Sequence, residues 1–406
     1  MPNIEKNKVR KGAAITGMGI ISAIGTTLEE NRKSLLSSQS GIGELTLINT
    51  KQVCQIKVGE IKWTNEQLMD QLYLPQDNNF TRTALLGLVA AREAVKNSGI
   101  SLDASIETGF ISATSVGGMD KTELHLKDFS SVKETQKYIA SHHAGDSTQK
   151  IADILGINGF VTTVSTACSS AANAIMLGAR MISSGQLDRV IVGGTDALSK
   201  FTINGFKTLM ILSDEVCTPF DAGRKGLNLG EAAAYLVMES EHIVKTQNRK
   251  VLAYLTGFGN ANDAFHQTAS SETGEGAVLA MQKALHMSNL NPADIDYINA
   301  HGTATPNNDS SESVALTRVF GKHMPDFSST KAFTGHTLAA AGAVEAVFSV
   351  MALQEQLVPP NLNFKSKIQE TGLEPVTVLK TKSIQHVLSN SFGFGGNCST
   401  MIFSKP

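Results

Sequence analysis

The stretch that decides the fold runs over residues 159–184 and reads GFVTTVSTACSSAANAIMLGARMISS. Its apolar, β-branched beginning, residues 160–164, predicts a strand, and residues 168–184 predict an alanine-rich helix. This helix has no polar face, and a helix that is apolar on all sides is buried on all sides. We therefore expect it to lie between two sheets, with Cys168 at the turn where the strand becomes the helix.

A second segment repeats this pattern in the other half of the chain. Residues 336–356 predict a long helix that is rich in Ala and Gly and apolar all round over residues 336–353. An apolar run closes on Gly-Met-Gly at residues 17–19, and another closes on Gly-Phe-Gly at residues 257–259. Such self-similarity indicates a weak internal duplication. We predict an α/β fold, a five-layer α/β/α/β/α sandwich of two duplicated halves at residues 9–250 and 251–406.

The remaining patterns supply alternating strands and helices around these two segments. Strands are predicted at residues 13–16, 108–113, 189–192, 232–239, 251–259, 296–300 and 388–391, and helices at residues 80–98, 275–288 and 308–320. Residues 26–80 and 114–150 show no clean pattern, which predicts loops and insertions. No apolar run approaches the about 18 residues that a membrane span requires, so we expect no membrane association.

Composition excludes several classes of function. The 406 residues include 35 Lys+Arg and 37 Asp+Glu, and this near balance gives no reason to expect nucleic acid as a partner. Cys54, Cys168, Cys217 and Cys398 form no CxxC pair, so we expect a reducing cytoplasm, with neither a disulfide framework nor a zinc site. Basic residues before residues 13–25 superficially resemble a signal peptide, but three glycines in that run favour a strand ending in a turn.

Cys168 is the candidate nucleophile. A thiol at a helix start meets unpaired backbone N–H groups and the positive end of the helix dipole, and both favour the thiolate. The alternative is a small buried hydrophobic residue, which is the usual role of a free cysteine. The polar neighbours Ser165, Thr166, Ser169 and Ser170 favour the nucleophile. The other three cysteines are expected to be structural.

Two histidines and a lysine complete the candidate site. His301 follows a predicted strand, at the end where ligands bind in α/β folds, and His336 begins the second apolar helix. Each has an alternative role as a cap of a turn or helix. Lys331 enters a buried helix, so we expect it to pair with a carboxylate such as Glu345 or Glu312. A cysteine with two histidines favours nucleophilic acyl transfer with electrophilic assistance to a second carbonyl.

The loop at residues 392–396, Phe-Gly-Phe-Gly-Gly, is too rich in glycine for a plain turn. Glycines let backbone N–H groups approach a ligand closely, and an oxyanion hole beside Cys168 needs such a donor with the cysteine's own N–H. The rival interpretation is a dinucleotide-binding loop. No strand-GxGxxG-helix unit with a downstream acid accompanies it, so we favour the oxyanion hole.

Together these motifs resemble the β-ketoacyl-acyl-carrier-protein synthases, specifically the elongating condensing enzymes with a Cys-His-His triad. The resemblance runs from residue 14 to residue 403 and rests on TACS at 166–169, TPFD at 218–221, NAHGTATP at 299–306, STK at 329–331, TGH at 334–336 and NSFGFGG at 390–396. It implies the thiolase-like fold. It also implies acyl carrier protein as partner, and either a homodimer or a heterodimer with a related ketosynthase or chain-length subunit.

The resemblance assigns roles to the candidate residues. Cys168 accepts the acyl chain from the phosphopantetheine thioester of the carrier protein, and the N–H groups of Cys168 and Phe394 form the oxyanion hole. His301 and His336 bind the malonyl thioester carbonyl and stabilise the enolate that decarboxylation forms. Lys331, with Glu345, supports the electrostatics around His336. The substrates arrive on the phosphopantetheine arm, and no metal or redox cofactor is implied.

Substrate-binding roles follow by position in the family pattern. Thr303 and Thr305 match threonines that contact the pantetheine arm or the malonyl group, and Gly395 lies beside them in the glycine loop. Phe394 matches a phenylalanine that gates the cysteine. The expected lining of the acyl pocket is Val116, Phe201 and Ile203.

Three departures from the family pattern bear on the pathway. Asn397-Cys398 stands where housekeeping members usually have Thr-Asn, residues 209–218 are shorter, and residues 227–231 read LNLGE. They favour a specialised cluster, such as one for aryl polyenes, flexirubin-type pigments or other polyketides, over primary fatty-acid synthesis. Two alternatives stay open: a thiolase acting on coenzyme A thioesters with Cys398 as acid/base, and a non-catalytic chain-length subunit, which lacks the nucleophile.

Overall fold

The computed structural model describes residues 12–53, 55–103 and 106–406, so the basic N-terminal residues and Cys54 lie outside the described residues. Ten strands form one mixed sheet. In spatial order they are β10 (Asp326–Ser328), β9 (Tyr297–Asn299), β13 (His386–Gly393), β14 (Asn397–Ser404), β8 (Ala253–Asn262), β1 (Ala13–Ile21), β7 (Ala232–Glu239), β6 (Arg189–Asp196), β4 (Thr108–Ala113) and β5 (Val161–Val164).

The two halves of this sheet repeat one topology. Outward from the centre, the N-terminal half runs β1-β7-β6-β4-β5 and the C-terminal half runs β8-β14-β13-β9-β10, so strands of the same rank occupy the same place. β1 and β8 pair antiparallel at the junction. The division at residues 250 and 251 stays a prediction. It falls between α8 (Glu241–Thr246) and β8, where one repeat of the topology ends and the next begins.

The repeated glycines explain how each half packs its outer helix. A Cβ at Gly19 would lie 2.2 Å from the carbonyl oxygen of Ala90 in α3 (Arg82–Ser98). A Cβ at Gly259 would lie 2.1 Å from the carbonyl oxygen of Ala280 in α9 (Glu275–Ser288). Both distances exclude a side chain, so the Gly-x-Gly signals in the sequence mark two equivalent strand–helix contacts.

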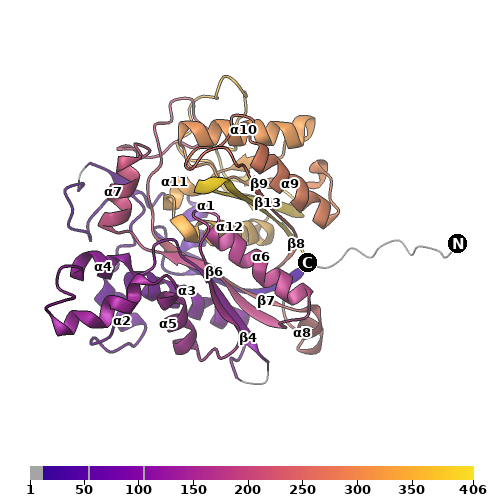
Figure 1. The fold of residues 1–406 in the computed structure, drawn as a ribbon. Helices are drawn as coiled ribbons and strands as arrows, with labels where there is room; N and C mark the ends of the chain where they lie inside the picture. Colours follow the sequence, from indigo (N-terminus) through magenta and orange to yellow (C-terminus); the bar gives the residue numbers. More distant parts are fainter. Residues whose placement is uncertain (1–11, 54, 104–105) are drawn as a thin grey trace.

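The two apolar helices form the central layer (Figure 1). α6 (Ser170–Ser183) contacts β6 and β14, and α12 (Ala341–Glu355) contacts β7 and β13, so each touches both half-sheets. α3 and α5 (Gly145–Leu155) cover the outer face of the N-terminal half, and α9 with α10 (Pro306–Phe320) covers that of the C-terminal half. The arrangement is the predicted five-layer sandwich.

Helix α12 corrects two expectations. It begins at Ala341, after a 3₁₀ turn at Leu338–Ala340, so His336 lies in the loop before the helix and does not start it. The apolar stretch Leu338–Glu355 also reaches the 18 residues that were not expected anywhere in the chain. Because 89% of that stretch is buried inside the protein, it is a core helix.

The segments predicted as loops contain regular structure. They hold α1 (Leu28–Leu36), β2 (Gly43–Glu44), β3 (Lys57–Val58), α2 (Asn65–Gln71), α4 (Met119–His125), a 3₁₀ helix at Lys133–His142 and the first part of α5. Thr27 and Thr64 cap the first two helices with their side chains. The remaining short elements are α7 (Lys200–Thr208), α11 (Lys331–Thr334), β11 (Leu357–Val358), β12 (Lys380–Thr381) and 3₁₀ turns at Pro292–Asp294, Gly321–His323 and Phe394–Gly396.

Candidate active site

A cavity of about 230 Å³ opens where the two halves of the fold meet. Cys168 reaches it from the turn before α6, His301 from the loop after β9, and His336 from the loop before α12. The glycine loop at residues 392–396 forms another wall. The structure therefore brings together four segments that lie more than thirty residues apart in the sequence.

The turn that carries Cys168 has an unusual backbone. Ala167 has a φ of +53°, in the left-handed region that a residue with a Cβ rarely adopts. The Ser170 N–H and hydroxyl both donate to the Ala167 carbonyl, at 3.1 and 2.5 Å, and hold this conformation. Gly393 packs against the turn, where a Cβ would lie 3.2 Å from the Cys168 nitrogen. Such strain costs of order 1–3 kcal/mol and concentrates at functional sites.

The acidity of Cys168 is opposite to the expectation. Burial raises the pKa of the thiol to about 11, although the Lys331 charge and the Phe394 N–H both lower it. The predicted depression of the pKa is wrong because Cys168 lies before the cap residue Ser169 and is only 6% exposed. The resting thiol is therefore protonated, and both the Phe394 N–H and the Cys168 N–H act on the sulfur.

The two catalytic-type histidines are buried and neutral. Their rings meet edge to face with centroids 5.5 Å apart. Burial, and then the Lys331 charge, lowers the pKa of His301 and of His336 well below the usual value. The His336 backbone is fixed on both sides, because its N–H donates to Asn228 O at 2.7 Å and its carbonyl accepts from Gly230 N at 2.9 Å. Neutral imidazoles present N–H donors without carrying a net charge.

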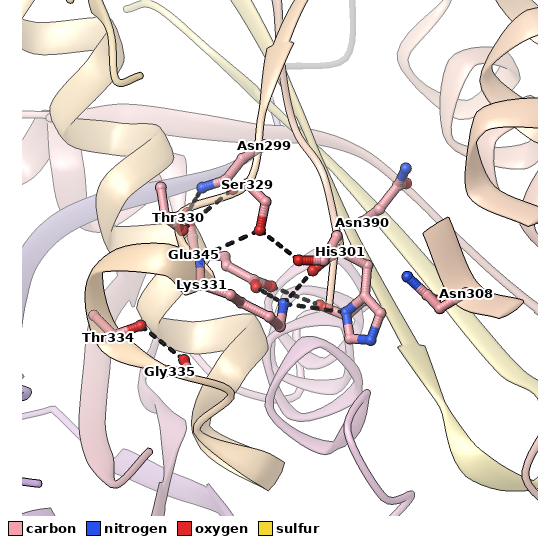
Figure 2. A network of polar contacts seen from close by, with 12 residues as sticks. Asn299, His301, Asn308, Ser329, Thr330, Lys331, Thr334, Gly335, Glu345 and Asn390 are labelled. Carbon is pink, nitrogen blue, oxygen red and sulfur yellow. Dashed lines mark hydrogen bonds and ion pairs between the residues drawn. The ribbon is translucent and has the colours of Figure 1, made fainter. Parts of the chain in front are cut away.

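Lys331 is the centre of the polar network shown in Figure 2. Its ammonium pairs with Glu345 and donates to the His301 carbonyl at 2.6 Å. It also lies 3.3 Å from His301 Nδ1. Because an ammonium can only donate, Nδ1 is the acceptor, and the proton of neutral His301 lies on Nε2. Ser391 donates to the other Glu345 oxygen at 3.3 Å.

Glu312 holds the backbone of the same loop from α10. Its two carboxylate oxygens accept the N–H groups of His301 at 2.9 Å and Gly302 at 2.8 Å, and Asn390 donates to it at 3.2 Å. Burial raises the pKa of Glu312 to about 7. Of the two carboxylates considered for Lys331, the structure pairs it with Glu345 and turns Glu312 to the His301 backbone. Over the described ranges, no group of three or more His, Cys, Asp or Glu side chains could hold a metal ion.

The expected substrate residues divide into two groups. Thr303, Thr305 and Gly395 line the cavity. Phe201 is exposed on α7 and Ile203 is fully buried in a side-chain cluster, and neither they nor Val116 lines the cavity. Their role in an acyl pocket stays a prediction.

Other residues line the cavity that the sequence analysis did not single out. From the α7 region these are Phe206, Ile211 and Leu227. Phe206 stacks on Phe394 with ring centroids 6.0 Å apart. Phe206 lies on the same helix as Phe201, and nothing in the sequence of that helix indicated that Phe206 contacts Phe394.

A rim loop at residues 263–271 was also missed. From this loop, His266, Thr268 and Ser270 line the cavity. The loop is joined to the glycine loop because Gly395 N donates to Gln267 O at 2.7 Å and Asp263 N donates to Gly396 O at 2.8 Å. The only indication in the sequence was that polar residues follow the predicted strand at residues 251–259. Nothing in the sequence showed that they lie beside residues 392–396.

Cys398 does not face Cys168, although both line the cavity. The preceding residue, Asn397, accepts a hydrogen bond from Ser169 beside Cys168. Successive side chains of a strand point to opposite faces, so Cys398 points away from the side on which Asn397 meets Ser169, and it packs in one cluster with Phe392. Burial raises the pKa of Cys398 to about 12. This placement disfavours a thiolase-type pair of cysteines.

Comparison with protein families gives two adjoining matches. Residues 11–242 match the β-ketoacyl synthase N-terminal domain, and residues 252–365 match the β-ketoacyl synthase C-terminal domain. Among curated proteins, the chain is 32% identical to 3-oxoacyl-[acyl-carrier-protein] synthase 2 of Staphylococcus aureus (strain COL), over 97% of this chain and 98% of the relative.

Solved structures with the same fold include two ketosynthase complexes. The ishigamide ketosynthase/chain length factor aligns with a TM-score of 0.91 and 28% identity, covering 98% of this chain and 100% of that chain. The ketosynthase ApeO in complex with its chain length factor ApeC, from Xenorhabdus doucetiae, aligns with a TM-score of 0.85 and 30% identity, covering 99% and 100%.

Proposed function

This chain belongs to the β-ketoacyl synthase family of condensing acyltransferases, and we propose that it catalyses a decarboxylative Claisen condensation of malonyl-acyl carrier protein with an acyl chain held on Cys168. One observation carries the residue assignment. A protonated thiol and two neutral imidazoles line one cavity, and backbone N–H groups act on the sulfur.

The first half-reaction loads the acyl chain. The Cys168 sulfur attacks the carbonyl of the acyl thioester, and the N–H groups of Cys168 and Phe394 stabilise the oxyanion of the tetrahedral intermediate. The bond to the pantetheine sulfur then breaks. The thiol proton leaves Cys168 and ends on the departing pantetheine thiol. Because the pKa of Cys168 is about 11, deprotonation accompanies the attack, and a neutral imidazole of the cavity accepts the proton in transit.

The second half-reaction forms the carbon–carbon bond. The malonyl thioester carbonyl accepts hydrogen bonds from His301 and His336, which stabilise the enolate as carbon dioxide leaves. The enolate carbon attacks the acyl-Cys168 carbonyl, and the oxyanion forms again beside Phe394. The carbon–sulfur bond breaks, which gives a 3-oxoacyl thioester on the carrier protein and returns the thiolate to be protonated. The positive charge of Lys331 favours the enolate and the Cys168 thiolate. The proposed half-reactions use no metal or redox cofactor.

The proposed pathway and partners rest on the sequence departures, on two related structures and on one edge strand. The departures at residues 209–218, 227–231 and 397–398, with the two ketosynthase–chain length factor relatives, favour a specialised polyene or polyketide pathway in the cytoplasm. Edge strand β5 is half-buried at all four positions, whereas its neighbour β4 is fully buried. This supports a subunit contact at that edge, with a second copy or a related chain-length subunit.

The test is direct acylation of the purified protein. An acyl-carrier-protein thioester is added, followed by malonyl-carrier protein, and the protein and products are identified by mass spectrometry. We expect acyl mass on Cys168 and a 3-oxoacyl product. Cys168→Ala abolishes acylation, and Cys168→Gln keeps malonyl decarboxylation while losing condensation.

Two outcomes would reject parts of this assignment. If Cys168→Ala still catalysed condensation at the normal rate, Cys168 would not be the nucleophile. Cys398→Ser tests the alternative of a thiolase that uses Cys398 as acid/base beside Cys168. An inactive variant would support that alternative, and an active one would exclude it. A wild-type protein that takes up no acyl group would favour the non-catalytic chain-length subunit.

A further inference from the structure

A cluster of amide and hydroxyl groups lies beneath the turn that carries Cys168. Asn397, the first residue of β14, is its centre. Its Oδ1 accepts hydrogen bonds from Ser169 Oγ at 2.8 Å, Asn173 Nδ2 at 2.9 Å and Asn260 Nδ2 at 3.0 Å. These donors come from the turn before α6, from α6 itself and from β8, the neighbour of β14, so one oxygen joins the central helix layer to the C-terminal half of the sheet.

The cluster holds both sides of the left-handed turn. Ser169 follows Cys168, and its hydroxyl contacts the Thr166 carbonyl at 2.7 Å as well as Asn397. Asn173 donates to the Thr166 hydroxyl at 2.8 Å. Thr166 and Ser169 enclose the turn, and Asn397 binds one directly and the other through Asn173. Its side chain thus contacts both flanks of the turn that carries the Cys168 N–H.

The same residue is bound into the glycine loop. Asn397 pairs with Gly393 in the β13–β14 ladder, and the two residues enclose the short turn that carries Phe394. Gly393 also packs on the Cys168 nitrogen. Asn397 therefore lies between the backbone of Cys168 and the backbone of Phe394, the two groups whose N–H bonds act on the sulfur.

We propose that Asn397 is a positioning residue that sets the separation and direction of the two oxyanion donors. The inference rests on the proposed function. An oxyanion hole stabilises the tetrahedral intermediates at the acyl-Cys168 carbonyl, whereas malonyl decarboxylation uses His301 and His336. Asn397 is consequently required for acyl transfer and condensation, and not for decarboxylation. Removing one well-placed oxyanion donor costs about 10²–10³ in kcat, and misdirecting it costs up to that amount.

The experiment compares the two half-reactions. Single-turnover acylation by an acyl-carrier-protein thioester is measured for wild type and Asn397→Ala. Malonyl decarboxylation is measured for Cys168→Gln with and without Asn397→Ala. We expect acylation to fall about ten- to a hundredfold and decarboxylation to change by less than about twofold, which also shows that the variant is folded.

Two further variants sharpen the comparison. Ser399→Ala is the matched control: the Ser399 hydroxyl lies 3.1 Å from Asn173 Oδ1, accepts from Asn260 at 3.0 Å and reaches Asn397 Oδ1 only at 3.4 Å, so its loss leaves the three shorter bonds of Asn397 to Ser169, Asn173 and Asn260 in place. We expect near wild-type acylation. Ser169→Ala removes the hydrogen bond to Asn397 from the other end together with the contact to the Thr166 carbonyl, and it costs no helix cap because Ser169 makes no side-chain capping bond. It tests the inference if Asn397→Ala does not fold, and we expect acylation to fall again.

The results separate two failures. If wild type takes up no acyl group on Cys168, the proposed function is wrong. If wild type is acylated and Asn397→Ala is acylated equally fast, or if both half-reactions fall together, the positioning role is wrong.

Discussion

The buried Lys331–Glu345 pair allows stability and catalysis to be separated. Lys331 is 3% exposed and Glu345 2%. Lys331→Met leaves the Glu345 carboxylate without its cation, and breaking a buried pair in this way costs about 3–5 kcal/mol of the free energy of unfolding. Replacing both partners by apolar groups of similar size is far milder, because no uncompensated charge remains. We therefore expect Lys331→Met/Glu345→Leu to regain most of the stability that Lys331→Met loses.

Decarboxylation should not recover in the double variant. Lys331 donates to the His301 carbonyl at 2.6 Å and lies 3.3 Å from Nδ1, so it fixes both the position and the tautomer of that imidazole. Loss of one charged hydrogen bond is worth about 1.5–3 kcal/mol. That energy corresponds to a decarboxylation rate about ten- to a hundredfold below wild type in both variants.

Urea unfolding, followed by the fluorescence of Trp63, the only tryptophan, gives the stability. Release of carbon dioxide from malonyl-carrier protein gives the activity. Lys150→Met is the control, because Lys150 pairs with Asp146 at 2.7 Å outside the site, and it should leave decarboxylation unchanged. If the double variant regains both stability and activity, Lys331 serves only as a counterion, and its role toward His301 is refuted.

Three further predictions use other features of the site. Because the pKa of Cys168 is about 11, its alkylation by iodoacetamide should rise about tenfold per pH unit from pH 7 to 10, and a plateau below pH 8 would contradict this. Burial raises the pKa of Glu312 to about 7, so the folded state binds this proton more tightly than the unfolded state, and stability falls as pH rises from about 4.5 to 7. Glu312→Gln should flatten the pH dependence of the urea midpoint there, whereas an unchanged slope would exclude Glu312 as its source. Gly393→Ala would place a Cβ 2.8 Å from the Thr166 carbonyl and 3.2 Å from the Cys168 nitrogen, so acylation of Cys168 should fall by up to about 10³, and near wild-type acylation would show that the turn yields freely.

The parts of the fold with a strong local pattern were predictable. β4 and β7 and helix α9 coincide with the predicted residues, because each is a buried run or a periodic segment of sufficient length. α1, α2 and α4 have only seven to nine residues, too few to establish a period, and the first two begin at threonine caps rather than at a periodic pattern. The start of α12 was placed five residues early because Leu338, Ala339 and Ala340, which form a 3₁₀ turn, continue the apolar composition of the helix.

The candidate site was predictable in composition but not in electrostatics. Cys168, His301 and His336 could be singled out because each lies where a predicted strand or helix begins or ends. The pKa of Cys168 could not be inferred, because burial by residues from the other half of the chain outweighs the local effect of the helix start. The partner of Lys331 was left open between two carboxylates for the same reason, since only the packing of α12 brings Glu345 to the ammonium.

The two residues at 397–398, which together depart from the family pattern, have different surroundings in the structure. On the sequence, Asn397-Cys398 formed a single deviation from the family pattern, with Cys398 as the residue of chemical interest. In the structure the two side chains lie on opposite faces of β14, as adjacent strand residues must. Cys398 packs in an apolar cluster with Phe392 in the cavity wall, where burial raises the pKa of its thiol, whereas Asn397 reaches the turn that carries Cys168. Asn397 therefore acts on acyl transfer through its hydrogen bond to Ser169, the residue after Cys168, whereas Cys398 lies in the wall of the cavity itself.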